Sequence, residues 1–226
     1  VMPTVGELKL NPGQAEKPGS GYFSRFSHDT EKAEPGYYAV NLDDYEVLAE
    51  MTSSERVGFH RYTFPETQEA HIILDMVYNI YHYEDKNVWT FIRVENDSLI
   101  TGYRQTNGWA RTKLVYFAME FSKPFKSYGQ KRYEEVKYNG FYRKFNEERN
   151  FPEMAGKDIR AYFDFDMEEG EELQVKMALS SVSTAGAIKN MQAEIPHWDF
   201  DQVKQEAQEK WNDELAKIEV EMNTEA

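Results

Sequence analysis

Two neighbouring carboxylates are the first side chains in this sequence that could do chemistry. Asp164 and Asp166 lie in the segment 161–167, where acidic side chains alternate with apolar ones. In a β-strand both carboxylates point to the same face, about 6.6 Å apart. Pairs of carboxyl groups at such separations catalyse glycoside hydrolysis. An acidic run follows at 168–172, however, and alternate acids beside such a run usually form a solvated sheet face. We favour that interpretation.

Histidine, cysteine and serine give no local signature of an active site. The five histidines form no HxH, HxxxH or HExxH pattern, so the sequence predicts no preformed zinc site. The absence of cysteine excludes disulfides, thiolate metal ligands and cysteine nucleophiles. GxSxG, GxGxxG and phosphate-loop motifs are absent as well. His60 lies in a strand-like segment, and we interpret it as a hydrogen-bonded strand residue rather than a ligand.

A polar loop before a Pro-Gly turn is a further candidate. His28, Glu31 and Glu34 precede Pro35-Gly36, after which an aromatic strand is expected. A loop of this kind is normally solvated, so the residue types alone assign it no function. Exposed aromatic rings could stack on sugars, although strand aromatics usually belong to the core. The aromatic candidates are Trp89, Trp109, Tyr37 and Tyr38.

Composition and charge exclude several classes of protein. The 226 residues include 26 Lys and Arg against 40 Asp and Glu, which gives a net charge of −14. Such a balance argues against a nucleic-acid partner or an anionic membrane surface. A hydrophobic content of 40% with 15% aromatic residues argues against disorder. The sequence has no apolar run of membrane-spanning length and no signal-peptide pattern, and because Val1–Val5 reads as mid-strand we expect a fragment.

Strand-like alternation runs from about residue 36 to residue 180 and sets the expected fold class. Long, aromatic-rich strands separated by polar breaks predict a mainly β protein, a large antiparallel two-sheet β-sandwich. Two hairpins are expected, one joining 161–167 to 173–179 with one solvated face, the other turning at Asn139-Gly140. The other expected strands are 36–42, 45–52, 56–64, 70–78, 88–94, 98–104 and 109–121, the last with Trp109 on its apolar side.

The last residues change to a helical period. Ser183 is expected to cap a short helix that Pro196 ends, and Asp199 with Gln202 resembles a capping box. A helix of about 24 residues is predicted to follow. Its apolar stripe is Val203, Ala207, Trp211, Leu215, Ile218 and Met222. The stripe either packs on the sandwich or bridges to a further domain, so we expect a sandwich domain over 1–182 and a helical linker over 183–226.

Several longer motifs occur along nearly the whole chain. The central ones are Phe26–Tyr38, which contains the polar loop, and Glu55–Pro65. The others are Met2–Gly6, Gly108–Ala110, Tyr116–Phe117, Glu120–Phe125, Val175–Ser183, Glu194–Phe200, Trp211–Asn212 and Leu215. In this order they resemble the motifs of glycoside hydrolase family 92, the exo-acting, calcium-dependent α-mannosidases.

The resemblance implies an N-terminal supersandwich of the galactose-mutarotase-like type, a helical linker and a C-terminal (α/α)₆ barrel. The general acid, the general base and the calcium ligands of the family lie on the barrel, so no catalytic or metal-binding residue is carried over to this chain. Calcium is expected in the missing catalytic domain. His28, Glu31 and Glu34 match a family motif and are expected to line the substrate site or the domain interface. The main sugar-contacting loops of the sandwich precede Val1 in the family.

The resemblance further implies an inverting hydrolase of mannose-containing glycans such as N-glycans, located in the periplasm, at the cell surface or outside the cell. Its partners would be its own (α/α)₆ domain and the glycan, and the isolated chain would be inactive. Two alternatives stay open. A free-standing carbohydrate-binding module would need an exposed aromatic platform or a loop site. Mutarotase-like chemistry would need His60 or His71 paired with a glutamate in a concave sheet.

Overall fold

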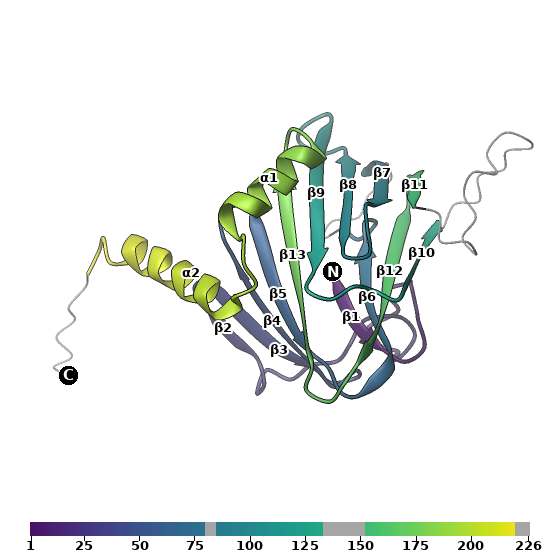
Figure 1. Ribbon diagram of the computed structural model, residues 1–226, viewed down its shortest axis with the longest axis horizontal. Coiled ribbons are helices and arrows are strands. Elements are labelled where there is room, and N and C mark those ends of the chain that lie inside the picture. The colour runs from purple at the N-terminus through teal and green to yellow at the C-terminus, as the bar shows by residue number, and fades with distance from the viewer. Residues whose placement is uncertain (80–84, 133–151, 220–226) are drawn as a thin grey trace, which may run out of the picture.

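Two antiparallel sheets packed face to face form the body of the protein (Figure 1). The computed structural model describes residues 1–79, 85–132 and 152–219. Within these residues, the smaller sheet has four strands in the order β1 (Met2–Val5), β6 (Thr67–Asp75), β12 (Ile159–Met167) and β10 (Ser127–Arg132). The larger has nine strands, in the order β11 (Glu153–Gly156), β7 (Asn87–Val94), β8 (Leu99–Thr106), β9 (Lys113–Phe121), β13 (Glu172–Ser180), β5 (Val57–Thr63), β4 (Val47–Ser53), β3 (Tyr37–Leu42) and β2 (Lys32–Glu34). The predicted β-sandwich is confirmed.

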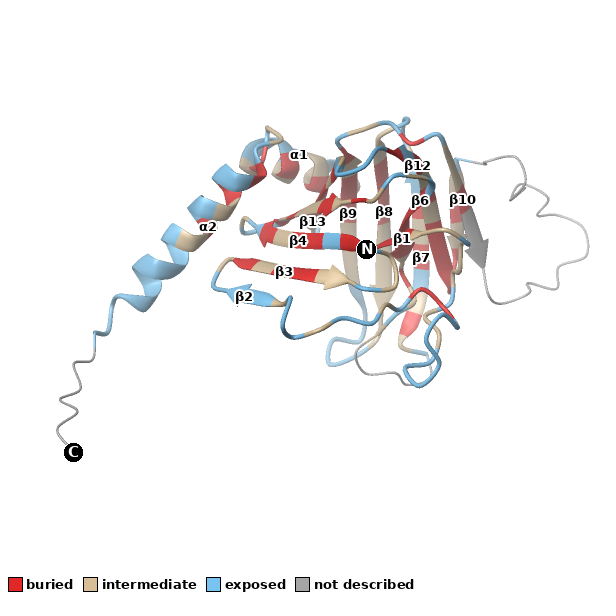
Figure 2. Cartoon of the chain, turned by 90° about the horizontal axis from the view of Figure 1, so that it is seen from below, coloured by how far each residue is buried: buried red, intermediate tan, exposed pale blue. Residues whose placement is uncertain are grey.

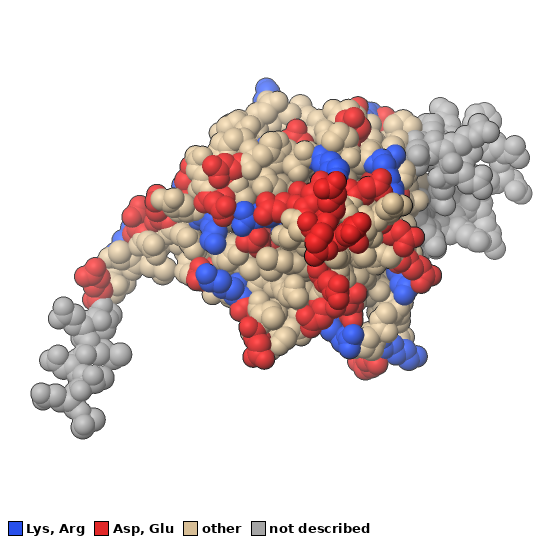
Figure 3. Space-filling model, turned by 60° about the horizontal axis from the view of Figure 1, so that its bottom comes forward, with Lys and Arg blue, Asp and Glu red and all other residues tan. Residues whose placement is uncertain are grey.

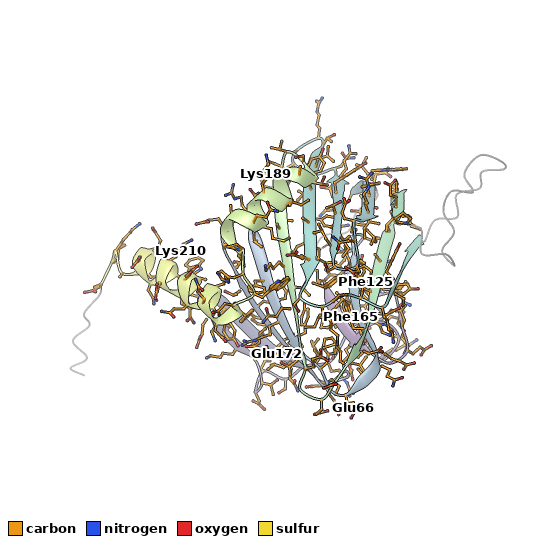
Figure 4. All side chains as sticks on the ribbon, viewed as in Figure 1. Glu66, Phe125, Phe165, Glu172, Lys189 and Lys210 are labelled. Carbon is orange, nitrogen blue, oxygen red and sulfur yellow. The ribbon has the colours of Figure 1, made fainter. Side chains whose placement is uncertain are left out.

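Aromatic side chains fill the space between the sheets. The ring of Phe121 on β9 lies 5.2 Å from both Phe163 and Phe165 on β12, measured between ring centres. Phe125 lies 5.3 Å from Phe163 in the same cluster. Figure 4 shows Phe125 and Phe165 between the sheets and Glu66 at the lower end of the sandwich. The period-two alternation in β12 therefore places the apolar face in the core, where each large side chain contributes about 1.5–3 kcal/mol.

The predicted hairpin between 161–167 and 173–179 is wrong. Both segments are strands, but β12 pairs with β6 and β10, whereas β13 pairs with β5 and β9 in the other sheet. The acidic connection therefore crosses from one sheet to the other. Lys176, expected on a solvated face, is buried, and its Nζ lies 3.8 Å from the ring centre of Trp198. Alternation specifies which face a side chain takes, but it specifies neither the neighbouring strand nor what covers the outer face.

Two other strand predictions need comment. The strand expected from Trp109 begins only at Lys113, because residues 107–112 form a loop in which the Gly108 N–H donates to the Ala110 carbonyl. Trp109 is consequently fully exposed. The hairpin predicted at Asn139-Gly140 lies outside the described residues.

Two helices follow β13, and both begin at the predicted caps. In α1 (Thr184–Glu194) the Ser183 Oγ accepts from the Gly186 N–H, and in α2 (Phe200–Leu215) the Asp199 side chain accepts from the Gln202 N–H. Figure 1 shows α1 lying across the nine-stranded sheet and α2 extending past its β2 edge. No helix among the described residues is long and apolar enough to cross a membrane.

The second helix is shorter than predicted, with 16 residues in place of about 24. Val203 and Ala207 are buried against the sheet, whereas Trp211 and Leu215 of the same stripe are exposed (Figure 2). Helices in proteins are stabilised mainly by packing of their apolar face. The helix therefore ends soon after its contact with the sandwich ends.

Replacing Gly36 by alanine tests the contact between the β2–β3 turn and α2. Gly36 has a φ of +79°, and a Cβ there would lie 3.0 Å from backbone and Cβ atoms of Ala207. We expect the free energy of unfolding in urea to fall by about 2–4 kcal/mol, because backbone strain and a steric clash add. Gly170→Ala is the matched control, since Gly170 has a φ of +72° but nothing within 4 Å of the added Cβ. Equal losses in the two variants would contradict a tight contact with α2.

Candidate functional site

Two of the three residues predicted from the polar loop form one hydrogen-bonded group. His28 Nδ1 lies 2.5 Å from Glu31 Oε2, and the Tyr38 hydroxyl donates to Glu31 Oε1 at 2.6 Å. We call these three side chains the His28–Glu31–Tyr38 relay. Tyr38 was named in the sequence only as an aromatic residue. The Pro35-Gly36 turn is the feature of the sequence that could have indicated this role for Tyr38. It folds β3 back beside β2 and places Tyr38 opposite Ala33.

The loop that carries His28 is held by its own hydrogen bonds. The Ser27 carbonyl accepts from the Thr30 N–H at 3.1 Å, and the Ser27 hydroxyl accepts from the Asp29 N–H at 3.1 Å. Three residues before His28, the backbone N–H and the Nε of Arg25 donate hydrogen bonds to Asp44 at 2.7 and 2.8 Å. The loop is thus fixed on both sides of His28 before any ligand arrives.

The electrostatics of the relay define where its protons lie. Hydrogen bonds from Tyr38 and then His28 hold the pKa of Glu31 below its ordinary value. The same carboxylate, together with burial, raises the pKa of Tyr38 to about 12. At neutral pH, Glu31 is therefore an ionised acceptor and Tyr38 a donor. The His28 side chain is 85% exposed, so the relay ends in an imidazole directed to solvent.

Glu34, the third predicted residue, does not join the relay. Its carboxylate accepts from Gln208 Nε2 of α2 at 3.1 Å and lies 3.0 Å from Lys32 Nζ. Glu34 therefore belongs to the contact that the β2–β3 hairpin makes with α2.

A second polar group fixes α2 to the sheet, and the sequence analysis missed it. Arg61 donates through Nε and a terminal nitrogen to the two carboxylate oxygens of Glu50, at 2.7 and 2.9 Å, and contacts Asp201 of α2 at 3.0 Å. Its guanidinium carbon lies 4.4 Å from the ring centre of Phe200. Burial alone would raise the pKa of Glu50, but Arg61 and Tyr37 hold that pKa below its ordinary value. We call Arg61, Glu50 and Asp201 the Arg61 clamp.

The carboxylate pair on β12 is used in contacts across the four-stranded sheet. Asp164 lies 2.6 Å from His71 Nδ1 and accepts from the Ser127 hydroxyl at 2.5 Å, while Asp166 accepts from Lys126 at 2.5 Å. His71 Nε2 faces the Gly6 carbonyl at 2.8 Å. These bonds link strands β10, β12 and β6 to the end of β1. Figure 3 shows many acidic side chains gathered on this lower side of the molecule.

His60 is a hydrogen-bonded strand residue, as predicted. Its Nδ1 lies 2.6 Å from the Tyr62 hydroxyl. Burial lowers the pKa of His60 to about 3. Neither His60 nor His71 contacts a glutamate in the described part of the chain, so the arrangement required by mutarotase-like chemistry is not seen there.

The low pKa of His60 predicts a loss of stability in mild acid. The unfolded chain binds a proton at this histidine below about pH 6.5, whereas the native chain does not until about pH 3. This histidine therefore lowers the free energy of unfolding by about 2 kcal/mol between pH 7.5 and pH 5. His60→Gln, which keeps a polar partner for Tyr62, should lose that part of the pH dependence. Urea unfolding of both proteins at the two pH values measures the difference, and identical pH dependences would contradict the prediction.

Metal-ligand clusters and exposed aromatic rings are the remaining candidate features. No group of three or more His, Asp or Glu side chains that could hold a metal ion exists among the described residues. Of the four aromatic candidates, Trp89 and Trp109 are exposed, Tyr37 is buried and Tyr38 belongs to the relay. Two sets of candidate residues therefore meet in the described part of the chain. His71 and Asp164 meet within the four-stranded sheet, and the polar-loop candidates His28 and Glu31 meet in the exposed His28–Glu31–Tyr38 relay.

A large antiparallel sandwich followed by two helices, with an exposed histidine relay on the loop before β2, defines a β-sandwich domain with a helical C-terminal part. Sequence comparison identifies it. The Glycosyl hydrolase family 92 N-terminal domain matches residues 1–180, and the Glycosyl hydrolase family 92 catalytic domain matches residues 186–226. The chain therefore belongs to glycosyl hydrolase family 92. No curated protein sequence matches it significantly.

Solved structures agree with the family assignment. A GH92 α-mannosidase from Bacteroides thetaiotaomicron is 40% identical over 98% of this chain, with a TM-score of 0.87. It has also been solved in complex with mannoimidazole. An inverting GH92 mannosidase from the same organism is 27% identical over 99% of this chain, with a TM-score of 0.78. The chain spans only 29% and 27% of the lengths of these two proteins.

Proposed function

We propose that this chain is the N-terminal sandwich of a longer exo-acting α-mannosidase that cleaves mannose-containing glycans with inversion. The observation that carries the proposal is the pair of family matches, because the catalytic-domain match begins within α1 and reaches residue 226. The 40% identity to an α-mannosidase supports the choice of sugar, and the inverting relative supports the stereochemistry.

In this proposal the sandwich positions the catalytic domain. The Arg61 clamp fixes the first turn of α2, and the last turn presents Trp211 and Leu215 to solvent. The start of α2 is thus held on the sandwich, while an apolar stripe at its end is exposed. This combination is typical of a helix whose end packs against another domain. The partner of the sandwich is then its own C-terminal (α/α)₆ domain, and the sandwich shapes one wall of the sugar pocket.

The chemistry itself is assigned to residues outside this chain. An inverting glycosidase uses a general acid and a general base about 6.5–9.5 Å apart, with a water between them. Calcium is part of the proposal, and in it the calcium ligands are residues of the catalytic domain. The described side chains include no group of three or more His, Asp or Glu that could hold a metal ion. The proposed location is the periplasm, the cell surface or the exterior, and N-glycans are the proposed physiological substrates.

The stereochemistry of the first product tests the mechanism. The longer protein should release β-mannose from an α-mannoside, seen by proton NMR before mutarotation equilibrates the two anomers. It should lose activity in a calcium chelator and regain it when calcium is added back. Release of α-mannose, or full activity in the chelator, would contradict the inverting or the calcium-dependent part of the proposal respectively.

A further inference from the structure

One nitrogen of the His28–Glu31–Tyr38 relay is left for a ligand. Both Glu31 oxygens are engaged, by His28 and by the Tyr38 hydroxyl. Because His28 Nδ1 faces this carboxylate, the neutral imidazole carries its proton on Nδ1. No described residue contacts His28 Nε2, so its lone pair is available to accept a hydrogen bond from outside the chain.

The imidazole is also preorganised. The turn around Ser27 and the bonds between Arg25 and Asp44 fix the backbone on either side of it. Glu31 fixes the orientation of the ring. Because the loop and the ring are already ordered, binding of a ligand costs little conformational entropy here. A single polar contact can then contribute measurable affinity.

An aromatic ring lies next to the imidazole of His28. The Phe26 and His28 ring centres are 5.4 Å apart with the planes at 86°, and Phe26 is half exposed. An exposed aromatic ring beside a hydrogen-bond acceptor matches a pyranose, which presents a C–H face and hydroxyl donors together. The hairpin that carries Tyr38 also contacts α2 through Glu34, and α2 lies within the residues that match the catalytic domain.

We propose that Phe26 and His28 form a contact for one pyranose unit of the substrate, with His28 Nε2 accepting a sugar hydroxyl and Phe26 packing against the sugar C–H face. The nature of the sugar, an α-mannoside, rests on the proposed function. His28 binds in this scheme and takes no part in bond cleavage. Glu31 and Tyr38 are positioning residues that hold the imidazole in the accepting tautomer.

Titration of the ¹⁵N-labelled chain with methyl α-mannopyranoside tests the contact without requiring catalysis. The ¹⁵N resonance of His28 Nε2 should shift saturably at millimolar sugar, while that of His197, whose Nδ1 already accepts from the Asp199 N–H, stays in place. Glu31→Gln keeps the side-chain size, removes the anion and should weaken the response. A His28 shift no larger than that of His197, or an equal shift with glycerol, would overturn the proposal.

Kinetics of the longer mannosidase provide the second readout. His28→Ala should raise KM about 3- to 10-fold with kcat nearly unchanged, the pattern expected when one hydrogen bond to the bound sugar is lost. The melting temperature should not change, because the side chain is exposed. An unchanged KM in an active enzyme overturns the sugar contact alone. An inactive wild-type protein overturns the proposed function, and the titration then decides the sugar contact by itself.

Discussion

Replacing Asp75 by alanine is expected to lower the free energy of unfolding by about 3–5 kcal/mol, the largest loss we expect from one polar side chain. Asp75 lies at the end of β6, and its Oδ2 accepts from Arg160 Nε and from the Tyr22 hydroxyl, both at 2.6 Å. The Arg160 and Asp75 side chains are each only 9% exposed. Removing the carboxylate would take a close ionic contact away from the buried Arg160 guanidinium.

Two further variants separate this effect from ordinary surface electrostatics. Glu153→Ala removes the partner of Arg93, in a pair whose side chains are 47% and 41% exposed, and should cost about 0.5 kcal/mol or less. Asp75→Asn combined with Arg160→Met should be less destabilised than Asp75→Ala, because the double variant buries neither charge. Urea unfolding measures all three variants. Similar losses in Asp75→Ala and Glu153→Ala would contradict the prediction.

Replacing Phe200 by alanine is expected to cost about 3–5 kcal/mol and to free the start of α2 from the sheet. The ring is 1% exposed and lies 5.4 Å from the ring of Phe59. Its loss also removes the aromatic face beneath the Arg61 guanidinium. The measurement is urea unfolding of the chain together with hydrogen exchange of the α2 amides, which should lose protection ahead of the sandwich.

Trp211 on the same helix provides the matched control. It is an aromatic residue two to three turns further along the helix, and it is 53% exposed in the chain. Trp211→Ala should change the free energy of unfolding by only about 0.5 kcal/mol, as exposed positions usually do. If both variants lose the same stability, α2 is held by its whole length and not by its first turn.

Most of the long strands and both helix caps could be predicted because their signals are local, whereas the shorter strands β2, β10 and β11 were not predicted. Alternation in 159–167 and the Ser183 and Asp199 caps depend on residues only a few positions apart. Partner strands could not be predicted in the same way. The run 168–172 looks like a hairpin turn by composition, and only the pairing of β12 with β6 and of β13 with β5 shows that it crosses between sheets.

The same distinction between local and distant signals applies to the candidate site. His28 and Glu31 are three residues apart, so one loop motif contained both residues, although their hydrogen bond was not predicted. Arg61 and Asp201 are 140 residues apart, and their contact depends on where α2 docks. Lys176 shows the same limit, because β13 alternates as a half-exposed strand would while Trp198 covers that face from another element. The role of the relay in sugar contact stays a prediction, as do the domain boundaries at 182 and 183.

We propose that this chain supports a catalytic domain and does not itself cleave glycosides. Mannose release from an α-mannoside, measured for the purified chain and for the proposed longer protein, tests this proposal most directly. We expect release by the longer protein and none above background by the chain. Release by the chain alone at a comparable rate would contradict the account.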